Sequence, residues 1–140
     1  MPTASYNKFQ PAIELMLEGG NLGSETWSVK LATGVSAAAG TITEVANGNG
    51  YTTGGNSVSV TSATQSSGTY KLILSDPAVW TASGAGFAFQ YAVLTGSTSG
   101  NVGYWDYGSS QTVAAGETVT VDLDQTNGRS EEHTSELQSH

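Results

Sequence analysis

The stretch Gly86-Phe87-Ala88-Phe89-Gln90-Tyr91-Ala92-Val93-Leu94 is the most aromatic part of the chain. Its odd-numbered positions from 87 to 93 hold three aromatic residues and a valine, and its even-numbered positions from 88 to 94 hold two alanines, a glutamine and a leucine. This period of two is typical of a β-strand. Because both sets are largely apolar, both faces are expected to be covered, and we predict a central strand over 86–94.

Similar alternation on either side of this stretch predicts further strands. Trp27, Val29 and Leu31 share one face of a predicted strand at 25–32. The other predicted strands are a hairpin of 56–64 and 69–75, an arm at 102–107 that pairs back on 86–94, and a last strand at 118–123. Residues 34–55, with the glycine clusters of 48–55, are predicted as mostly coil. About six or seven strands with turns at roughly 8 to 12 residue spacing predict a mainly β fold, an antiparallel, jelly-roll-like β-sandwich.

One short N-terminal α-helix is predicted over residues 8–18. Apolar residues recur there at helical spacing, and Gly19-Gly20 supplies a stop. The apolar positions are Phe9, Ile13, Met16 and Leu17. The start leaves two alternatives: Asn7 and Gln10 form a capping box, or Gln10 is the cap and Pro11 is the first helical residue. In either case we expect the apolar stripe to pack on the rest of the domain.

Composition excludes several classes of protein. The 140 residues include 18 glycines and no cysteine, and only 11% of them are charged, which fits one turn-rich β domain without disulfides. A net charge of -8 gives no cationic surface, so we expect no nucleic-acid partner. No apolar run approaches the ~18 residues of a membrane helix, and Met1 to Ser5 lacks the basic start of a signal peptide, so we expect no membrane partner.

The C-terminal segment 129–140 resembles the translated read-through of a short-read sequencing adapter over all of its positions. Both histidines and the only arginine lie in this segment, so residues 1–128 contain no His, Arg or Cys. We therefore expect a single β-sandwich domain at 1–128 that lacks its last strand, followed by a non-native tail at 129–140.

This chemistry excludes most catalytic sites. Triads and zinc sites built on His or Cys cannot be assembled from residues 1–128, so we expect no catalytic residues, metal site or cofactor. The glycine clusters lack the Lys-Ser/Thr ending of a phosphate loop and are read as turns. Asp122, Asp124 and Glu117 carry oxygen ligands that suit calcium, but an acidic, soluble surface explains them more simply.

Trp105, Asp106 and Tyr107 are the candidate ligand contacts. A carboxylate between two aromatic side chains suits a sugar, and with a second acid it would suit glycoside cleavage. The simpler interpretation is that Asp106 flanks a strand and the aromatic rings pack on the sheet. Trp27, Trp80 and Trp105 leave the same choice between a carbohydrate platform and the core, and core positions are the commoner use of such rings.

Several motifs together resemble a family of small proteins encoded in tailed-phage genomes and prophages. They span nearly all of residues 1–128. They are Met1-Pro2-Thr3-Ala4-Ser5-Tyr6-Asn7-Lys8-Phe9-Gln10-Pro11, Asn21-Leu22-Gly23-Ser24, Ile42-Thr43-Glu44, Gly48-Asn49-Gly50-Tyr51, Thr69-Tyr70-Lys71-Leu72, Asp76-Pro77-Ala78-Val79-Trp80-Thr81-Ala82-Ser83-Gly84, Tyr91-Ala92-Val93-Leu94 and Trp105-Asp106-Tyr107-Gly108-Ser109.

The resemblance implies a non-catalytic role in the virion, as a capsid decoration protein or another head or tail component. Its partners would then be other virion proteins in a symmetric or multivalent assembly, after synthesis in the cytoplasm of the bacterial host. The alternative function is a carbohydrate-binding β-sandwich module, which would use Trp80, Trp105, Tyr104 and Tyr107 with calcium at Asp122 and Asp124. An enzyme using Asp106 and another acid is a third hypothesis.

Overall fold

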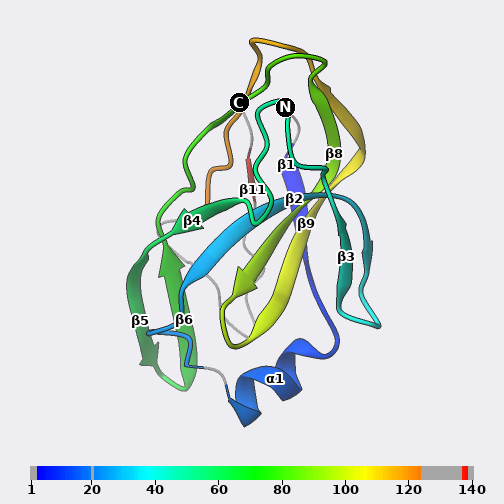
Figure 1. Cartoon of the computed structure of the whole chain (residues 1–140). Coiled ribbons are helices and arrows are strands. Elements are labelled where there is room, and N and C mark those ends of the chain that lie inside the picture. Colours follow the sequence, from blue (N-terminus) through cyan, green and yellow to red (C-terminus); the bar gives the residue numbers. More distant parts are fainter. Residues whose placement is uncertain (1–2, 20, 124–136, 139–140) are drawn as a thin grey trace.

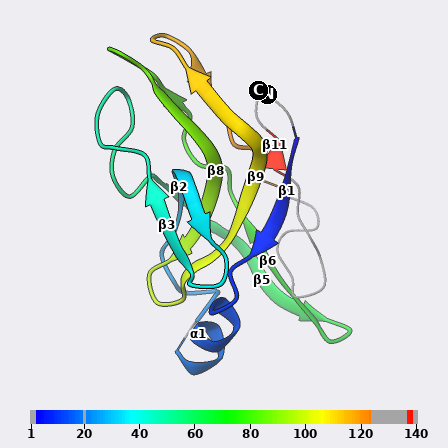
Figure 2. The same cartoon turned by 90° about the vertical axis from the view of Figure 1, so that its right-hand side faces the viewer.

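Strand β8 (Phe87–Gly96) lies at the centre of the main sheet in the computed structural model, which describes residues 3–19, 21–123 and 137–138 (Figure 1). It pairs antiparallel with β9 (Gly100–Val113) and with β2 (Trp27–Ser36). The other strands of this sheet are β1 (Thr3–Lys8), β3 (Thr41–Glu44), β4 (Asn56–Val58) and β11 (Leu137–Gln138). The order is β11-β1-β9-β8-β2-β3, with β4 on the other end of β2 (Figure 2). The predicted central strand is confirmed.

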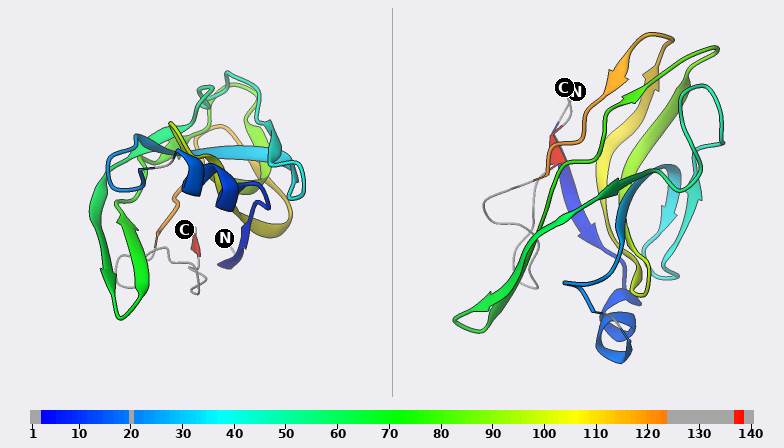
Figure 3. Two further views of the ribbon diagram at one scale, coloured as in Figure 1. Left: turned by 90° about the horizontal axis from the view of Figure 1, so that it is seen from below. Right: turned by 60° about the vertical axis from the view of Figure 1, so that its left-hand side comes forward.

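The remaining strands lie on one side of the main sheet (Figure 3). Strands β5 (Val60–Ser66) and β6 (Thr69–Leu74) form a hairpin, and β7 (Trp80–Thr81) pairs with β10 (Thr118–Val119). The hairpin turn has positive φ at Ser67 (52°) and Gly68 (81°), the combination whose twist matches the flanking strands. The prediction of a mainly β, antiparallel, sandwich-like fold with one helix is confirmed, and the jelly-roll connectivity stays a prediction.

The hydrophobic core lies between the main sheet and these shorter strands. Trp27, Val29 and Leu31 are at most 1% exposed, which confirms the predicted inward face of β2. On β9, Trp105 is also buried and meets Tyr6 of β1 in an edge-to-face contact with ring centroids 5.2 Å apart. Gly103 makes this approach possible, because a Cβ there would collide with the Tyr6 ring. The core is therefore built around aromatic side chains of neighbouring strands.

The N-terminal helix is shorter than predicted and begins later. Helix α1 spans Ala12–Glu18, while residues 3–8 form β1, so the predicted start at residue 8 is wrong. The alternation of buried Ala4 and Tyr6 with exposed residues lets this segment pair with β9 and bury an aromatic ring, which a helix there would not achieve. Pro11 occupies the N-cap, so neither predicted start is correct, and its missing N–H removes no helical hydrogen bond there.

The predicted apolar stripe of the helix does not pack as expected. Phe9 is buried but precedes the helix, and Ala12 is the only helical residue that is buried. Met16 is half-buried, whereas Ile13 and Leu17 are exposed. The entry to the helix fixes this orientation, because Phe9 is anchored on Tyr104 and Pro11 lies against the turn at Gly40. Of the predicted stripe, Phe9 and Met16 therefore pack on the core, while Ile13 and Leu17 are exposed.

The segment 34–55 contains more strand than predicted. Strand β2 continues to Ser36 and turns into β3, which pairs with it from Thr41 to Glu44. A register shift between Ala32 and Gly34 interrupts this pairing. The sequence therefore lacks the regular alternation of apolar and polar residues that predicts a hairpin. Residues after Val45 do form a loop, with a single bridge between Gly48 and Tyr51. The coil prediction is thus wrong for the hairpin and right for the glycine-rich part.

A buried carboxylate attaches the loop after α1 to the β8–β9 turn. Glu25 is 8% exposed and accepts hydrogen bonds from the backbone N–H groups of Asn21 (3.0 Å), Thr98 (2.9 Å) and Ser99 (2.7 Å), and from the Ser99 hydroxyl (2.5 Å). Burial by itself raises the pKa of Glu25, but these hydrogen bonds outweigh burial and hold the pKa below its ordinary value. Glu25 is therefore ionised in the folded protein at neutral pH, and it holds the loop after α1 against the β8–β9 turn.

A second buried group holds the 45–55 loop against β2. The Tyr51 hydroxyl donates to Glu44 Oε2 (2.5 Å) and accepts from the Leu31 N–H (3.2 Å), while Gly54 N–H also donates to Glu44 Oε2 (2.6 Å). Burial and the Glu44 carboxylate raise the pKa of Tyr51 far above its ordinary value, so the phenol stays protonated. The loop is thereby fixed to the sheet edge at one hydroxyl.

Replacing Tyr51 with phenylalanine should therefore lower the free energy of unfolding by about 1–3 kcal/mol, because the buried Leu31 N–H and Glu44 both lose a partner. Urea unfolding monitored by tryptophan fluorescence measures this. Tyr70→Phe is the control, because Tyr70 is half-buried on β6, outside this network. Equal stability of the two variants would contradict the assigned role of the Tyr51 hydroxyl.

Of the segment 124–140, the structure describes only Leu137–Gln138, which pairs with Thr3 and Ala4 of β1. The other residues of the predicted tail at 129–140 lie outside the described residues, as does the end of the predicted domain at residue 128. The predicted last strand at 118–123 is present in its first part, as β10.

Candidate functional site

The structure separates the three predicted ligand contacts. Trp105 and Tyr107 are only 1% and 5% exposed, and Tyr107 packs edge-to-face on Phe89 with ring centroids 5.3 Å apart. Asp106, between them, is half-buried and points to the opposite face of β9. These two rings therefore follow the simpler interpretation and belong to the core. Trp27 and Trp80 are buried as well, so none of the three tryptophans forms an exposed platform.

Strand register gathers a different set of side chains around Asp106. Asp106 lies opposite Ser5 of β1 on one side and Tyr91 of β8 on the other. Tyr104, two residues before it, lies opposite Asn7 of β1. Residues that oppose each other across strands share a face of the sheet, so these five side chains lie on the face turned away from the core. We call Ser5, Asn7, Tyr91, Tyr104 and Asp106 the outer-face cluster.

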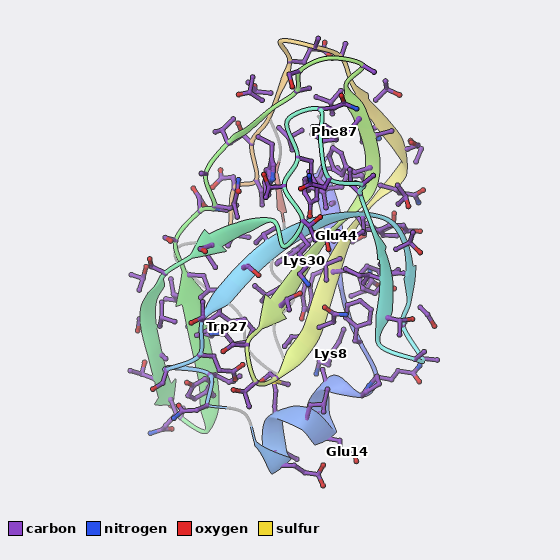
Figure 4. The ribbon with its side chains drawn as sticks, viewed as in Figure 1. Lys8, Glu14, Trp27, Lys30, Glu44 and Phe87 are labelled. Atoms are coloured by element: carbon purple, nitrogen blue, oxygen red, sulfur yellow. The ribbon has the colours of Figure 1, made fainter. Side chains whose placement is uncertain are left out.

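The outer-face cluster is open to solvent. Ser5 and Asn7 are exposed, and Tyr91, Tyr104 and Asp106 are each half-buried. The shorter strands that complete the sandwich lie on the other side of the sheet, and Figure 2 shows that no described strand covers this one. Lys30 of β2, labelled in Figure 4, lies opposite Val93, and Val93 lies opposite Tyr104, so Lys30 is in the row of Tyr104 on this face.

Two contacts fix the aromatic rings of the cluster. Tyr91 and Tyr104 meet edge-to-face, with centroids 5.7 Å apart and ring planes at 79°. Phe9, which is fully buried, packs on Tyr104 at 5.0 Å from below. Slight burial, together with the charge of Asp106 and the neighbouring Tyr104, raises the pKa of Tyr91, so its phenol is a protonated donor at neutral pH.

The carboxylate of the cluster is also held in place. Asp106 Oδ1 accepts hydrogen bonds from Gln90 Nε2 (3.1 Å) and from the Gly108 N–H (2.8 Å). The pairing of β8 with β9 skips residues 107–110, because Phe89 opposes Gln111 and Tyr91 opposes Asp106. This bulge brings Gly108, with φ of 85°, back to Asp106. The bulge therefore changes the direction of the side chains around Asp106.

The sequence alone identifies only part of this cluster. Asp106 and Tyr104 are among the predicted carbohydrate contacts, whereas Tyr91 is predicted only as part of a central strand. The bulge that sets Tyr91 opposite Asp106 leaves a trace in the sequence, Gly108-Ser109-Ser110 inside an otherwise aromatic strand. Ser5 and Asn7 belong to the segment whose strand was not predicted.

The predicted calcium ligands do not form a cluster in the part of the chain that the structure describes. Within residues 3–19 and 21–123, no group of three or more acidic side chains could hold a metal ion. Glu117 accepts a hydrogen bond from the Ala114 N–H (2.8 Å) within its own turn, and Asp124 lies outside the described residues.

Comparisons with protein-family models, with curated proteins and with solved structures find no match to this chain. In the described residues, no helix is both long enough and apolar enough to cross a membrane.

Helix α1 presents the second unusual surface. Ile13, Leu15 and Leu17 are 37%, 43% and 81% exposed, and they lie beside the acidic Glu14 and Glu18. Figure 4 places Glu14 on the outer side of α1, at the end of the molecule away from the 45–55 loop. Ile13 and Leu17 lie one turn apart on the same side of the helix, whereas Leu15 lies on the other side, near Gly100 of the β8–β9 turn. The side with Ile13 and Leu17 is a small apolar surface that contact with another molecule would cover.

Proposed function

We propose that this protein is a non-catalytic structural subunit of a phage particle, a capsid decoration protein or another head or tail component. Its partners are other virion proteins. The observation that carries the proposal is Leu17, which is 81% exposed on α1 and shares one side of the helix with Ile13, four residues earlier. The resemblance of the sequence motifs to a tailed-phage family suggests the class of particle.

The exposure of Leu17 supports contact with a protein surface. Only Ala12 of the seven helical residues is fully buried, and Leu17 is 81% exposed. Covering Leu17 and the exposed part of Ile13 removes apolar area from water, which is the main favourable contribution to protein association. In a symmetric particle such a contact is repeated many times, so each one can be weak.

The β5–β6 hairpin offers a second assembly surface. It forms a two-stranded sheet of its own and extends from the body of the molecule toward the same end as α1 (Figure 3). Thr61, Thr64, Gln65 and Ser67 are exposed along it. A projecting hairpin can reach a neighbouring subunit without a change in the core of either protein.

Mass spectrometry of purified particles tests the proposed function directly. Intact particles of a phage that encodes this protein should contain its peptides together with those of the known head and tail proteins. Their absence from particles in which those proteins are detected would overturn the proposal.

The α1 surface gives a sharper prediction. Replacing Leu17 with serine should reduce incorporation into particles about tenfold, because burial of a leucine contributes about 1.5–3 kcal/mol to association. The stability of the free protein should change by less than about 0.5 kcal/mol, since the Leu17 side chain is 81% exposed. Quantitative immunoblotting of purified particles measures incorporation, and thermal unfolding measures stability.

Val79→Ser is the matched control, because Val79 is also a large hydrophobic residue, 49% exposed, but lies outside α1. It should be incorporated like the wild type. Normal incorporation of the Leu17→Ser variant would show that α1 is not the assembly surface.

A further inference from the structure

We infer that the outer-face cluster is a binding site for neutral glycans, with Tyr91 and Tyr104 contacting the sugar rings and Asp106 accepting hydrogen bonds from sugar hydroxyls. This activity goes beyond the proposed assembly role and does not depend on it, because none of the five residues belongs to α1 or to the β5–β6 hairpin. The inference rests on three properties of the cluster: its aromatic rings, its fixed carboxylate and its charge.

The aromatic rings suit a saccharide. The face of an aromatic ring carries negative potential and attracts the polarised C–H groups on the face of a pyranose. Tyr91 and Tyr104 are held at 79° to each other, and Phe9 supports Tyr104 from below, so the rings lose little freedom when a ligand binds. Both tyrosines are half-buried, and a phenol hydroxyl can donate and accept hydrogen bonds, which gives each ring a polar end for hydroxyl groups.

The Asp106 carboxylate is held in a fixed orientation and can accept hydrogen bonds from sugar hydroxyls. One oxygen of Asp106 is engaged by Gln90 and by the Gly108 N–H, which fixes the orientation of the group. Hydrogen bonds from a hydroxyl to a carboxylate are shorter and stronger than those between neutral groups. Ser5 and Asn7 on β1 and Tyr91 on β8 flank Asp106 and Tyr104, so donors and acceptors lie on three neighbouring strands.

The charge of the molecule selects the class of glycan. The chain carries a net charge of -8, and the only charged member of the cluster is Asp106. Lys30, a cation on the same face, lies in the row of Tyr104 with Val93 between them, whereas Asp106 lies directly opposite Tyr91. A uronate or sialate bound at Asp106 would place its negative charge beside that carboxylate, and like charges in contact repel. Neutral hexoses bring hydroxyl donors without that repulsion. The ligand class is therefore a neutral oligosaccharide.

NMR titration of the ¹⁵N-labelled full chain tests this inference. The probes are cellohexaose, laminarihexaose, mannohexaose and chitohexaose, with an oligogalacturonate as the anionic comparison. At least one neutral probe should shift the amide signals of Tyr91, Tyr104 and Asp106 at or below about 5 mM. No shift with any neutral probe, shifts only elsewhere in the chain, or tighter binding of the oligogalacturonate would each overturn the inference.

Variants distinguish ligand contact from folding. Tyr104→Ala and Asp106→Asn should each weaken binding of the responding probe about tenfold, while Tyr104→Phe should keep most of the ring contact. Tyr70→Ala, a half-buried tyrosine on β6 outside the cluster, should bind like the wild type. Binding that survives both Tyr104→Ala and Asp106→Asn would overturn the assignment. Virion incorporation is not the readout here, so failure of this test leaves the assembly role intact.

Discussion

Replacing Glu25 with glutamine lowers the free energy of unfolding at pH 7 by about 2–4 kcal/mol, because a charged acceptor of four hydrogen bonds is replaced by an amide that cannot accept them all. The amide oxygen can still accept from Thr98 and Ser99. Its NH2 group, however, replaces the oxygen that accepts from the Asn21 N–H and from the Ser99 hydroxyl, so the buried hydroxyl loses its charged acceptor. Urea unfolding of the full chain measures the difference.

The same substitution changes the pH dependence of stability. The pKa of Glu25 lies below 4.5 in the folded protein and returns toward that value on unfolding, so below pH 4.5 the unfolded state binds more protons. The contribution of Glu25 is therefore complete above the unfolded pKa and is lost as the pH falls through the folded pKa. Glu25→Gln should show a flatter decline over this acid range than the wild type.

Glu117→Gln is the matched control for Glu25. Glu117 is exposed and accepts one local hydrogen bond, from Ala114, which a glutamine oxygen can also accept. Its stability should stay within about 0.5 kcal/mol of the wild type. If Glu25→Gln were as stable as this control at pH 7, the buried carboxylate would not be what closes the loop onto the β8–β9 turn.

The strands could be predicted because their faces differ in burial. At 25–32, large apolar residues alternate with polar ones and are buried on one face of the sheet. At 86–94, apolar residues occupy both faces of the strand. The β2–β3 hairpin is harder to predict because a register shift near Gly34 and short polar residues erase the period. Local sequence indicates a strand where large apolar residues mark one or both of its faces, and small polar residues give no such mark.

For the helix, the sequence pattern predicts more than the structure contains. Residues 8–18 carry a helical period, yet the chain uses only Ala12–Glu18 as a helix and turns Ile13 and Leu17 outward. Pairing of β1 with β9 decides where the helix begins, and that partner lies about a hundred residues away in sequence. Periodicity reports an apolar side of a helix but not what covers it.

The candidate site depends on register in the same way. The sequence places Asp106 between two aromatic residues, but alternation sends both of these into the core. The side chains that surround Asp106 come from β1 and β8, and only the pairing of Ser5 and Tyr91 with Asp106 reveals them. Neighbours across a sheet cannot be read from one strand, since a shift of one residue exchanges its faces.

Substituting Gly55 with alanine should destabilise the protein by about 3–5 kcal/mol, because two costs add at this position. Its φ of 71° is left-handed, and an added Cβ would collide with the carbonyl oxygen of Val29 and lie 2.7 Å from the Val29 carbonyl carbon and 2.8 Å from Lys30 Cα. The loop would have to move off β2, which has a rigid backbone at this point. Urea unfolding of the full chain measures the change.

Gly54→Ala separates the two costs. Gly54 also has a left-handed φ, 99°, but an added Cβ there meets no atom within 4 Å, so this variant should lose only about 1–2 kcal/mol. Displacing the loop in Gly55→Ala also pulls Tyr51 from Leu31, so Tyr51→Phe should cost less in that background than in the wild type. Equal stability of the two alanine variants, with additive effects of Tyr51→Phe, would mean that the loop does not depend on its close approach to β2.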